Sequence, residues 1–280
     1  MENSGPCKCD LEGAGRSAPL VKWPGGKRGL LRALLPLVPS DYRRYYEPFL
    51  GGGALFFALR PDRSILGDRN CELISMYREV RDNPDRVIAS LRRLKNTEKE
   101  YYRVRASRPI AGAARAARLL YLMTLAFNGI HRVNLRGEFN VPYGFKTHLD
   151  PCEEPKIRQA SIALANTRLV NEDFERTVAS AAAGDVVYLD PPYTTSHRNN
   201  GFVKYNAKIF TWNDQRRLAA LAERLVKRGC SVIVSNADHE SIDELYRGFD
   251  KVRVPRHSVI AASAHFRRGV SECVFYRVGI

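Results

Sequence analysis

The stretch YYEPFLGGGALFFALRPDRSILGD, residues 45–68, contains two short apolar runs separated by a glycine turn and a helical segment. Residues 45–50 predict a buried strand, and residues 54–59 have the spacing of a helix. Residues 64–68 predict a second strand, which ends on an acid. Together these elements predict one β-α-β unit whose glycines stand at the first strand-to-helix turn. An α/β fold is therefore the first expectation.

The strand and helix pattern returns in the second half of the chain, after a long helical and Arg-rich interval. Residues 71–126 have helical periodicity, and residues 128–144 break it with Asn, Gly and Pro. Within that break, residues 138–141 alternate as a hairpin or an extended loop does. The other expected elements are a helical run at 30–37, strands at 168–170, 185–190, 231–235, 251–255 and 272–278, and helices at 213–228 and 241–247.

This order predicts an α/β core interrupted by a second domain. We expect the core to comprise residues 18–74 and 163–280, and the mainly helical insert, with its hairpin, to comprise residues 75–162. Residues 1–17 contain Gly and Ser and predict a flexible tail. In the insert, Arg115 and Arg118 are expected on a solvated helix face.

The charge of the chain predicts a polyanionic partner. The 280 residues include 45 Lys and Arg against 30 Asp and Glu, which gives a net charge of +15. Such a field attracts nucleic acid or an anionic membrane surface. Since no apolar stretch is long enough to span a bilayer, we expect no membrane partner and favour nucleic acid. No obligate protein partner is evident.

The six cysteines predict reduced thiols rather than disulfides or a metal site. They are Cys7, Cys9, Cys71, Cys152, Cys230 and Cys273, with no CxxC pair and no His at metal-ligand spacing. No signal peptide opens the chain. We therefore expect no metal ion and a cytoplasmic protein, of a prokaryotic or phage-infected cell.

The glycines at 51–53 and the acid Asp68 predict a ligand with a ribose. A glycine turn that opens a helix lets the main chain approach a ligand, although glycine also serves turns that bind nothing. Asp68 ends the next strand, where a carboxylate can accept both ribose hydroxyls. Since no Lys-Ser/Thr pair follows the glycines, a phosphate-binding loop is disfavoured.

The tetrapeptide Asp190-Pro191-Pro192-Tyr193 directly follows an apolar strand and predicts chemistry on an amine. Prolines alone would merely end a strand, because they lack the backbone donor. An exocyclic adenine amine is a poor nucleophile, since its lone pair is delocalised into the ring. A carboxylate and a backbone carbonyl that accept its two hydrogens free that lone pair. Tyr193 can stack on the base, a contact of about 1–3 kcal/mol.

In these motifs the sequence resembles the amino-methylating DNA adenine methyltransferases of the Dam type, in order from residue 20 to the C-terminus. The matching segments are VKWPGGK at 21–27, EPFLGGG at 47–53, GDRN at 67–70, NEDF at 171–174, DPPY at 190–193, VSN at 234–236 and RRGVSEC at 267–273. The resemblance implies a Rossmann-like methyltransferase core that uses S-adenosylmethionine, with an inserted DNA-recognition domain. It also implies transfer of a methyl group to the N6 amine of an adenine flipped out of double-stranded DNA.

The resemblance assigns roles to matching residues. Asp190, Pro191, Pro192 and Tyr193 are the implied catalytic residues. The implied cofactor-binding residues are Trp23, Lys27, Glu47, Pro48, Phe49, Gly51, Gly53, Asp68, Asp173, Phe174 and Asp190.

The segment NGIHRVNLRGEFNVPYG at 128–144 is similar to the family's recognition segment, which implies GATC as the target. Arg132 would read a guanine in the major groove, where forked contacts are the commonest specific device. His131, Val133 and the stretch after Gly144 depart from the family's pattern. The polar stretch 194–208 is either a plain loop or a lid that closes on DNA. The full expected DNA-binding set is Lys22, Phe127, Asn128, Ile130, Arg132, Asn134, Arg136, Pro142, Phe202 and Tyr205.

Two alternatives remain open at this point. The same amine-holding geometry would serve methylation of RNA or of a cytosine amine. A DNA-binding regulator that keeps S-adenosylmethionine as a structural ligand is an alternative from another class. A cognate restriction endonuclease is a possible partner, whereas no nuclease metal cluster is visible in this chain.

Overall fold

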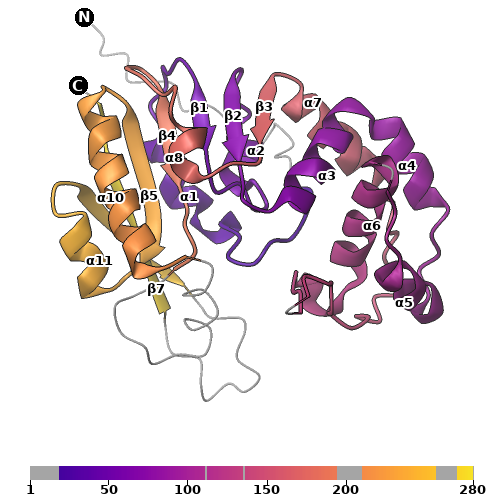
Figure 1. Cartoon of the computed structure of the whole chain (residues 1–280). Coiled ribbons are helices and arrows are strands. Elements are labelled where there is room, and N and C mark those ends of the chain that lie inside the picture. The colour runs from indigo at the N-terminus through magenta and orange to yellow at the C-terminus, as the bar shows by residue number, and fades with distance from the viewer. Residues whose placement is uncertain (1–18, 111, 135, 194–209, 257–269, 280) are drawn as a thin grey trace, which may run out of the picture.

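The computed structural model describes residues 19–110, 112–134, 136–193, 210–256 and 270–279. The expected tail at 1–17 lies outside these residues. The strands are β1 (Tyr45–Glu47), β2 (Ser64–Gly67), β3 (Thr167–Val170), β4 (Val186–Leu189), β5 (Ser231–Ala237), β6 (Asp250–Arg256) and β7 (Val270–Arg277). In the described part of the chain they form one seven-stranded sheet in the order β3-β2-β1-β4-β5-β7-β6 (Figure 1).

The expected helices at 54–59, 213–228 and 241–247 are present with small shifts of their ends, and the expected helical interval 71–126 is divided into four helices. The helices at 154–164 and 174–177 were not predicted. The N-terminal ones are α1 (Leu31–Leu34), flanked by the 3-10 turns Arg28–Leu30 and Leu35–Leu37, and α2 (Ala54–Leu59). Those of the insert region are α3 (Cys71–Asp82), α4 (Pro84–Arg92), α5 (Glu98–Ala106), α6 (Gly112–Leu125) and α7 (Glu154–Leu164). The C-terminal ones are α8 (Phe174–Thr177), α10 (Trp212–Lys227) and α11 (Glu240–Leu245).

The sheet grows in both directions from β1. Strands β1 to β5 pair in parallel, and β7 runs antiparallel to β5 and β6. Because β2 lies on one side of β1 and β4 on the other, the order reverses between β1 and β4. Open α/β sheets bind ligands at the carboxyl ends of the strands at such a switch point. The expected α/β, Rossmann-like core is confirmed, and both predicted motifs follow the two strands at its switch point.

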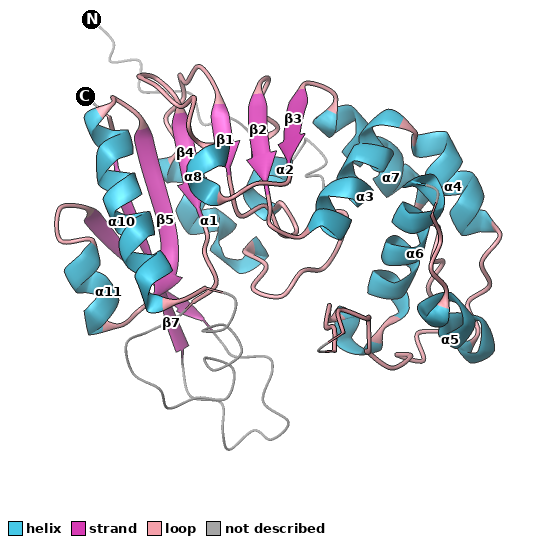
Figure 2. Cartoon of the chain, in the orientation of Figure 1, coloured by secondary structure: helices cyan, strands magenta, loops and turns pink. Residues whose placement is uncertain are grey.

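Both faces of the sheet are buried, which explains the uninterrupted apolar runs in its strands. Tyr45 and Tyr188 belong to an apolar cluster on one face, while Tyr46 and Val187 belong to a cluster on the other. Residues of α8, α10 and α11 cover the second face, and those of α1, α2 and α3 cover the first. Figure 2 shows α8 and α10 in front of the strands.

The helical insert lies beside the β3 edge of the sheet (Figure 1). Its core is continuous with the first apolar cluster, which includes Leu66 of β2, Leu120 of α6 and Leu164 of α7. Helix α3 packs against both α6 and α7. The sheet and the insert therefore share one apolar core. No helix of the described residues is long and apolar enough to cross a membrane.

Three local expectations are refined by the structure. The first strand ends at Glu47 rather than at residue 50, because Pro48 lacks the N–H that a central strand donates. Among the described residues, the expected hairpin is an extended loop with isolated bridges at Ala126–Tyr143 and Val133–Phe139. The placement of Arg118 on a solvated helix face is wrong. Its guanidinium is buried and donates to the carbonyl of Arg105 at 2.8 Å.

Candidate active site

The loop after β1 is a tight turn packed against an indole ring. Gly51 and Gly53 have φ angles of 47° and 65°, a left-handed conformation that glycine adopts readily. A Cβ atom at Gly51 would lie 2.9 Å from Cδ1 of Trp23, closer than real side chains approach. Both the turn and the Trp23 contact therefore require glycine here, whether or not a ligand is bound.

Asp68 follows β2 and holds this turn from the neighbouring strand. Its Oδ2 accepts a hydrogen bond of 3.0 Å from the Gly51 N–H, and its Oδ1 accepts one of 2.8 Å from the Asn70 N–H. Burial raises the pKa of Asp68, and these two donors oppose the shift. A carboxylate oxygen has more than one lone pair. The group that fixes the turn is therefore also chemically suited to accept ligand hydroxyls.

Asp190 follows β4, and its carboxylate belongs to a cluster of four polar side chains. Lys27 Nζ lies 3.0 Å from Asp190 Oδ1 and 3.9 Å from Glu272 Oε2. The Tyr193 hydroxyl donates a hydrogen bond of 2.7 Å to Glu272 Oε2, and Lys27 Nζ lies 4.6 Å from the centre of the Tyr193 ring. Because Lys27 and Glu272 are only 5% and 2% exposed, their charges interact more strongly than a surface pair.

The Tyr193 hydroxyl keeps its proton in this cluster. Burial, Asp190 and Glu272 hold the pKa of the Tyr193 hydroxyl well above its ordinary value. The hydroxyl therefore remains a donor to Glu272, which orients the ring. Lys27 is the cation shared by both acids, and it also donates a hydrogen bond to the carbonyl of Gly25. One lysine thus links the N-terminal segment, β4 and β7.

A buried amide supports the tetrapeptide from behind. Gln215 Nε2 donates a hydrogen bond of 3.3 Å to the carbonyl of Pro192, and Gln215 Oε1 accepts one of 3.0 Å from Asn236 Nδ2. Neither amide residue is exposed to solvent. Gln215 was not among the predicted site residues. Its signal in the sequence is a glutamine on the apolar face of α10, in line with Leu218 and Ala222.

Glu47, at the end of β1, faces the interior of the protein. The Tyr45 hydroxyl donates a hydrogen bond of 2.8 Å to Glu47 Oε2, and the side chain is 2% exposed. Burial raises the pKa of Glu47 to about 8, and the charges of Asp190 and Asp68 act in the same direction. Glu47 is therefore mainly neutral at pH 7. Pro48, next to it, is also buried.

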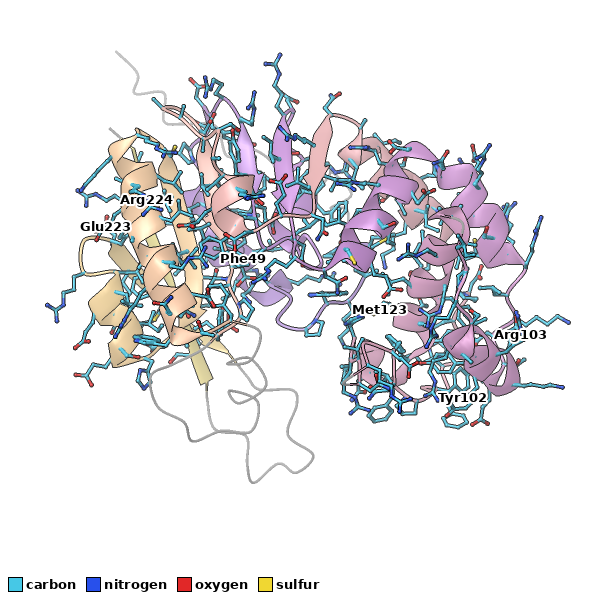
Figure 3. The ribbon with its side chains drawn as sticks, in the orientation of Figure 1. Phe49, Tyr102, Arg103, Met123, Glu223 and Arg224 are labelled. Carbon is cyan, nitrogen blue, oxygen red and sulfur yellow. The ribbon has the colours of Figure 1, made fainter. Side chains whose placement is uncertain are left out.

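An aromatic group lies beside the glycine turn. Phe49 stacks on Phe174 with ring centres 5.5 Å apart and meets Phe210 edge-on at 5.7 Å. Figure 3 places Phe49 at the lower edge of the sheet, where the strands end. Asp173 begins α8 by accepting a hydrogen bond from the Glu175 N–H, and Arg217 lies 3.2 Å from its Oδ1. The structure therefore brings the expected residues Phe49, Asp173 and Phe174 to the same edge of the sheet as Asp68 and Asp190.

The expected guanine reader, Arg132, is held by its own loop. Its Nε donates a hydrogen bond of 2.8 Å to Asn140 Oδ1, and its guanidinium is solvent-exposed. Asn134 Oδ1 accepts from the N–H groups of Arg136 and Glu138 at 2.9 and 3.0 Å. Asn134 thus builds the turn, whereas Arg132 and Arg136 extend toward solvent.

The remaining expected DNA contacts gather near the start of this loop. Phe127 and Ile130 are 52% and 40% exposed, so two apolar side chains of this loop are open to solvent. Asn128 has a left-handed φ of 53°. Lys22 of the core reaches this loop, since a Cβ atom at Gly129 would lie 3.2 Å from its Cδ. Pro142 is exposed and accepts a hydrogen bond from the Phe127 N–H. Phe202 and Tyr205 lie outside the described residues.

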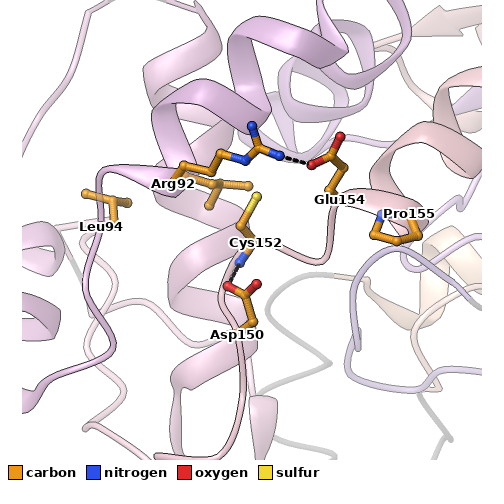
Figure 4. A pocket seen from close by; sticks show the side chains of 7 residues that line it. Arg92, Leu94, Asp150, Cys152, Glu154 and Pro155 are labelled. Carbon is orange, nitrogen blue, oxygen red and sulfur yellow. Dashed lines mark hydrogen bonds and ion pairs between the residues drawn. The ribbon is translucent and has the colours of Figure 1, made fainter.

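Two other features of the described chain stand apart from these residues. A hollow of about 460 Å³ in the insert is lined by residues that include Cys152, Asp150 and the ion pair of Arg92 with Glu154 (Figure 4). Near β7, the group Asp238, Asp243 and Cys273 has atoms close enough to hold a metal ion. The ammonium of Lys251 already lies 3.1 Å from Asp238 Oδ1, so a protein cation neutralises that group.

Comparison with known proteins connects this geometry to a family. Residues 23–260 match the family model described as D12 class N6 adenine-specific DNA methyltransferase. The Type II methyltransferase M1.LlaDCHI of Lactococcus lactis subsp. cremoris is 35% identical over 93% of this chain and 95% of its own length. The DNA adenine methylase of Escherichia coli K12 is 33% identical over 93% of this chain and 95% of its own. The Type II methyltransferase M.MjaIII of Methanocaldococcus jannaschii is 32% identical over 91% and 96%.

Proposed function

Because this chain belongs to the D12 class of N6 adenine-specific DNA methyltransferases, we propose that it methylates a flipped adenine within GATC, with S-adenosylmethionine as the methyl donor. The chain is a transferase that acts on DNA. The observation that carries the finer proposal is the cluster of Lys27, Asp190, Tyr193 and Glu272 at the switch point of the sheet.

Asp190 and the backbone after it hold the target amine. The carboxylate accepts one amine hydrogen, and a carbonyl of the proline pair accepts the other, so that the nitrogen becomes tetrahedral and its lone pair is no longer delocalised into the ring. Lys27, 3.0 Å from Asp190, stabilises the ionised carboxylate that this role needs. Gln215 fixes the peptide between Pro192 and Tyr193 by donating a hydrogen bond to the Pro192 carbonyl. Such positioning supplies most of the rate enhancement in a transfer that needs little acid–base help.

The edge of the sheet has the chemistry that S-adenosylmethionine requires. Asp68 supplies a carboxylate for the ribose hydroxyls, and Phe49 and Phe174 supply apolar ring surface for the adenine. The glycine turn allows the methionine part to approach the main chain. When bound, the cofactor supplies a methyl group on a positively charged sulfur. Trp23, Lys27 and Asp173 complete the proposed set, and the buried Glu47 and Pro48 support it from within.

The substrate adenine must leave the duplex, because its amine is otherwise paired and unreachable. Tyr193 is the ring on which the extruded base stacks, and its orientation is set by Glu272. Exposed Phe127 and left-handed Asn128 are the side chains assigned to the gap in the duplex. We assign recognition to residues 75–162 and catalysis to the two flanking segments.

Arg132, Ile130, Pro142 and Lys22 are assigned to the bases of GATC, with Asn134 and Arg136 beside them. The net charge of +15 supplies the sequence-independent attraction to phosphate. Since two of the relatives are named Type II methyltransferases, a restriction endonuclease for the same site is the partner to look for in the cell's cytoplasm.

The proposal is tested by the product and by one substitution. Wild-type protein is incubated with labelled S-adenosylmethionine and, separately, with a GATC duplex, the same duplex carrying GTTC, and an RNA of matching sequence. Nucleoside analysis should give N6-methyladenine from the GATC duplex alone. Asp190→Asn should lose at least about a hundredfold in rate, whereas Asp62→Asn, an exposed loop acid, should not.

Methylcytosine or methylated RNA as the product would refute the proposed substrate. Tight GATC binding with no methyl transfer by the wild type would instead favour the regulator that keeps the cofactor as a structural ligand.

A further inference from the structure

A stack of rings joins the N-terminal segment to the recognition loop. The Trp23 indole lies on the His131 imidazole, with ring centres 4.6 Å apart and planes inclined by 24°. His131 also contacts the Phe139 ring edge-on, with ring centres 5.7 Å apart. His131 therefore lies between a residue of the core and a residue on the far side of the recognition loop.

One end of this stack rests on the glycine turn. Trp23 Cδ1 would be 2.9 Å from a Cβ atom on Gly51, and Trp23 Cβ would be 3.4 Å from one on Gly52. The indole thus covers the turn that Asp68 holds through the Gly51 N–H. A displacement of this turn toward Trp23 would therefore push against the indole.

At the other end of the stack, His131 and Phe139 each lie next to a residue of the Arg132–Asn140 hydrogen bond. His131 immediately precedes Arg132, and Phe139 immediately precedes Asn140, the side chain that binds Arg132. The main chains of the two segments are also paired, because the Asn140 N–H donates a hydrogen bond of 3.1 Å to the Arg132 carbonyl. The His131–Phe139 contact therefore sets the spacing of the two loop segments that present Arg132.

A histidine is unexpected at the centre of this stack of rings. Its Nε2 is buried and has no hydrogen-bond partner among the described residues, a condition that disfavours a polar ring. Burial also lowers the pKa of His131 to about 4, so the ring is neutral at pH 7. Its contribution to the stack is a flat aromatic face, and that contribution does not change with pH near neutrality.

We propose that His131 is a positioning residue that couples occupation of the cofactor site to the arrangement of Arg132. This inference rests on the proposed function, since it assumes that the glycine turn holds the cofactor and that Arg132 reads DNA. A ligand on the turn restricts Gly51 and hence Trp23, and the stack passes this restriction to His131 and the recognition loop. The second ligand then binds a loop that is already ordered, which makes binding of the two ligands cooperative.

The test measures this cooperativity directly. The dissociation constant of a fluorescent GATC duplex is determined with and without saturating S-adenosylhomocysteine, and the ratio of the two constants is the coupling factor. For the wild type we expect a coupling factor of at least about 5, the lower end of the usual range. His131→Leu places a side chain of similar size there without the flat ring, and should reduce the factor to about 1. His131→Phe keeps a ring, and should preserve the factor within about twofold.

A matched control and the melting temperature separate coupling from mere stability. His148→Leu removes an exposed histidine and should leave the coupling factor unchanged. A purely structural role of His131 would lower the melting temperature and weaken both affinities while leaving their ratio intact.

The inference is overturned if His131→Leu keeps the wild-type factor, if His131→Phe loses it, or if the wild type itself shows none. Failure of the wild type to bind or methylate the GATC duplex is a different result, which refutes the proposed function instead.

Discussion

Replacing Glu47 with glutamine removes a carboxyl group that burial keeps neutral. The pKa of Glu47 is raised from 4.5 to about 8, mainly by burial. Since this pKa is higher in the folded than in the unfolded state, the folded protein binds the proton more tightly. The stability that this proton contributes is fully present below about pH 4.5 and is lost as the pH rises through about 8.

The size of the effect follows from the two pKa values. Each pH unit between them changes the free energy of unfolding by about 1.4 kcal/mol. Between pH 6 and pH 9 the wild type should therefore lose about 2.5 kcal/mol through this group. The E47Q substitution removes only the titrating group, because the amide oxygen of the new side chain can still accept the hydrogen bond from Tyr45. The variant's stability relative to the wild type should rise by about 2.5 kcal/mol over the same range.

Urea unfolding followed by circular dichroism at pH 6, 7, 8 and 9 measures this difference at constant ionic strength. Glu223→Gln, which removes an exposed acid of α10, is the control for loss of a carboxyl group. A difference between the wild type and E47Q that changes by less than about 0.5 kcal/mol over this range would show that Glu47 is ionised in the folded protein.

Three further substitutions test the cluster, the insert and the recognition loop. Lys27→Met removes the cation shared by Asp190 and Glu272. It should lower the free energy of unfolding in urea by about 3–5 kcal/mol and abolish methyl transfer. Unchanged stability would contradict the buried ion pair. Arg118→Met should cost about 1–3 kcal/mol by leaving buried carbonyls unpaired, and a solvated Arg118 would give no change. Arg132→Ala should weaken binding to a GATC duplex by about 1–3 kcal/mol while binding to unrelated DNA stays nearly constant, and equal losses on both duplexes would assign it to phosphate.

The sheet was predictable because its strands are buried on both faces and read as short apolar runs between glycines and prolines. Asp68 and Asp190 were predictable for the same reason, since an acid directly after such a run must lie at the carboxyl edge of the sheet. The other residues expected near Asp68 and Asp190 were inferred from the resemblance, because spacing in the sequence does not show that Lys27 contacts Asp190.

The contacts that could not be predicted from the sequence join segments that are far apart in the chain. Gln215 supports Pro192 from α10, and His131 of the recognition loop stacks on Trp23 of the N-terminal segment. Neither pairing follows from local periodicity. Arg118 was misplaced because the helix is buried from Ala116 to Met123, so Arg118 is covered although it lies about one turn from exposed Arg115.

The shared apolar core sets limits on reprogramming this enzyme toward new DNA targets. Phe139, Val141 and Tyr143 of the recognition loop belong to the same cluster as Leu66 of the sheet. Transplanting residues 75–162 from a relative would therefore replace side chains against which the strands themselves pack. Selection for altered specificity should instead randomise the exposed positions of the loop, such as Ile130, and keep its buried anchors. A library built this way varies the exposed side chains of the loop and keeps the buried side chains that anchor it.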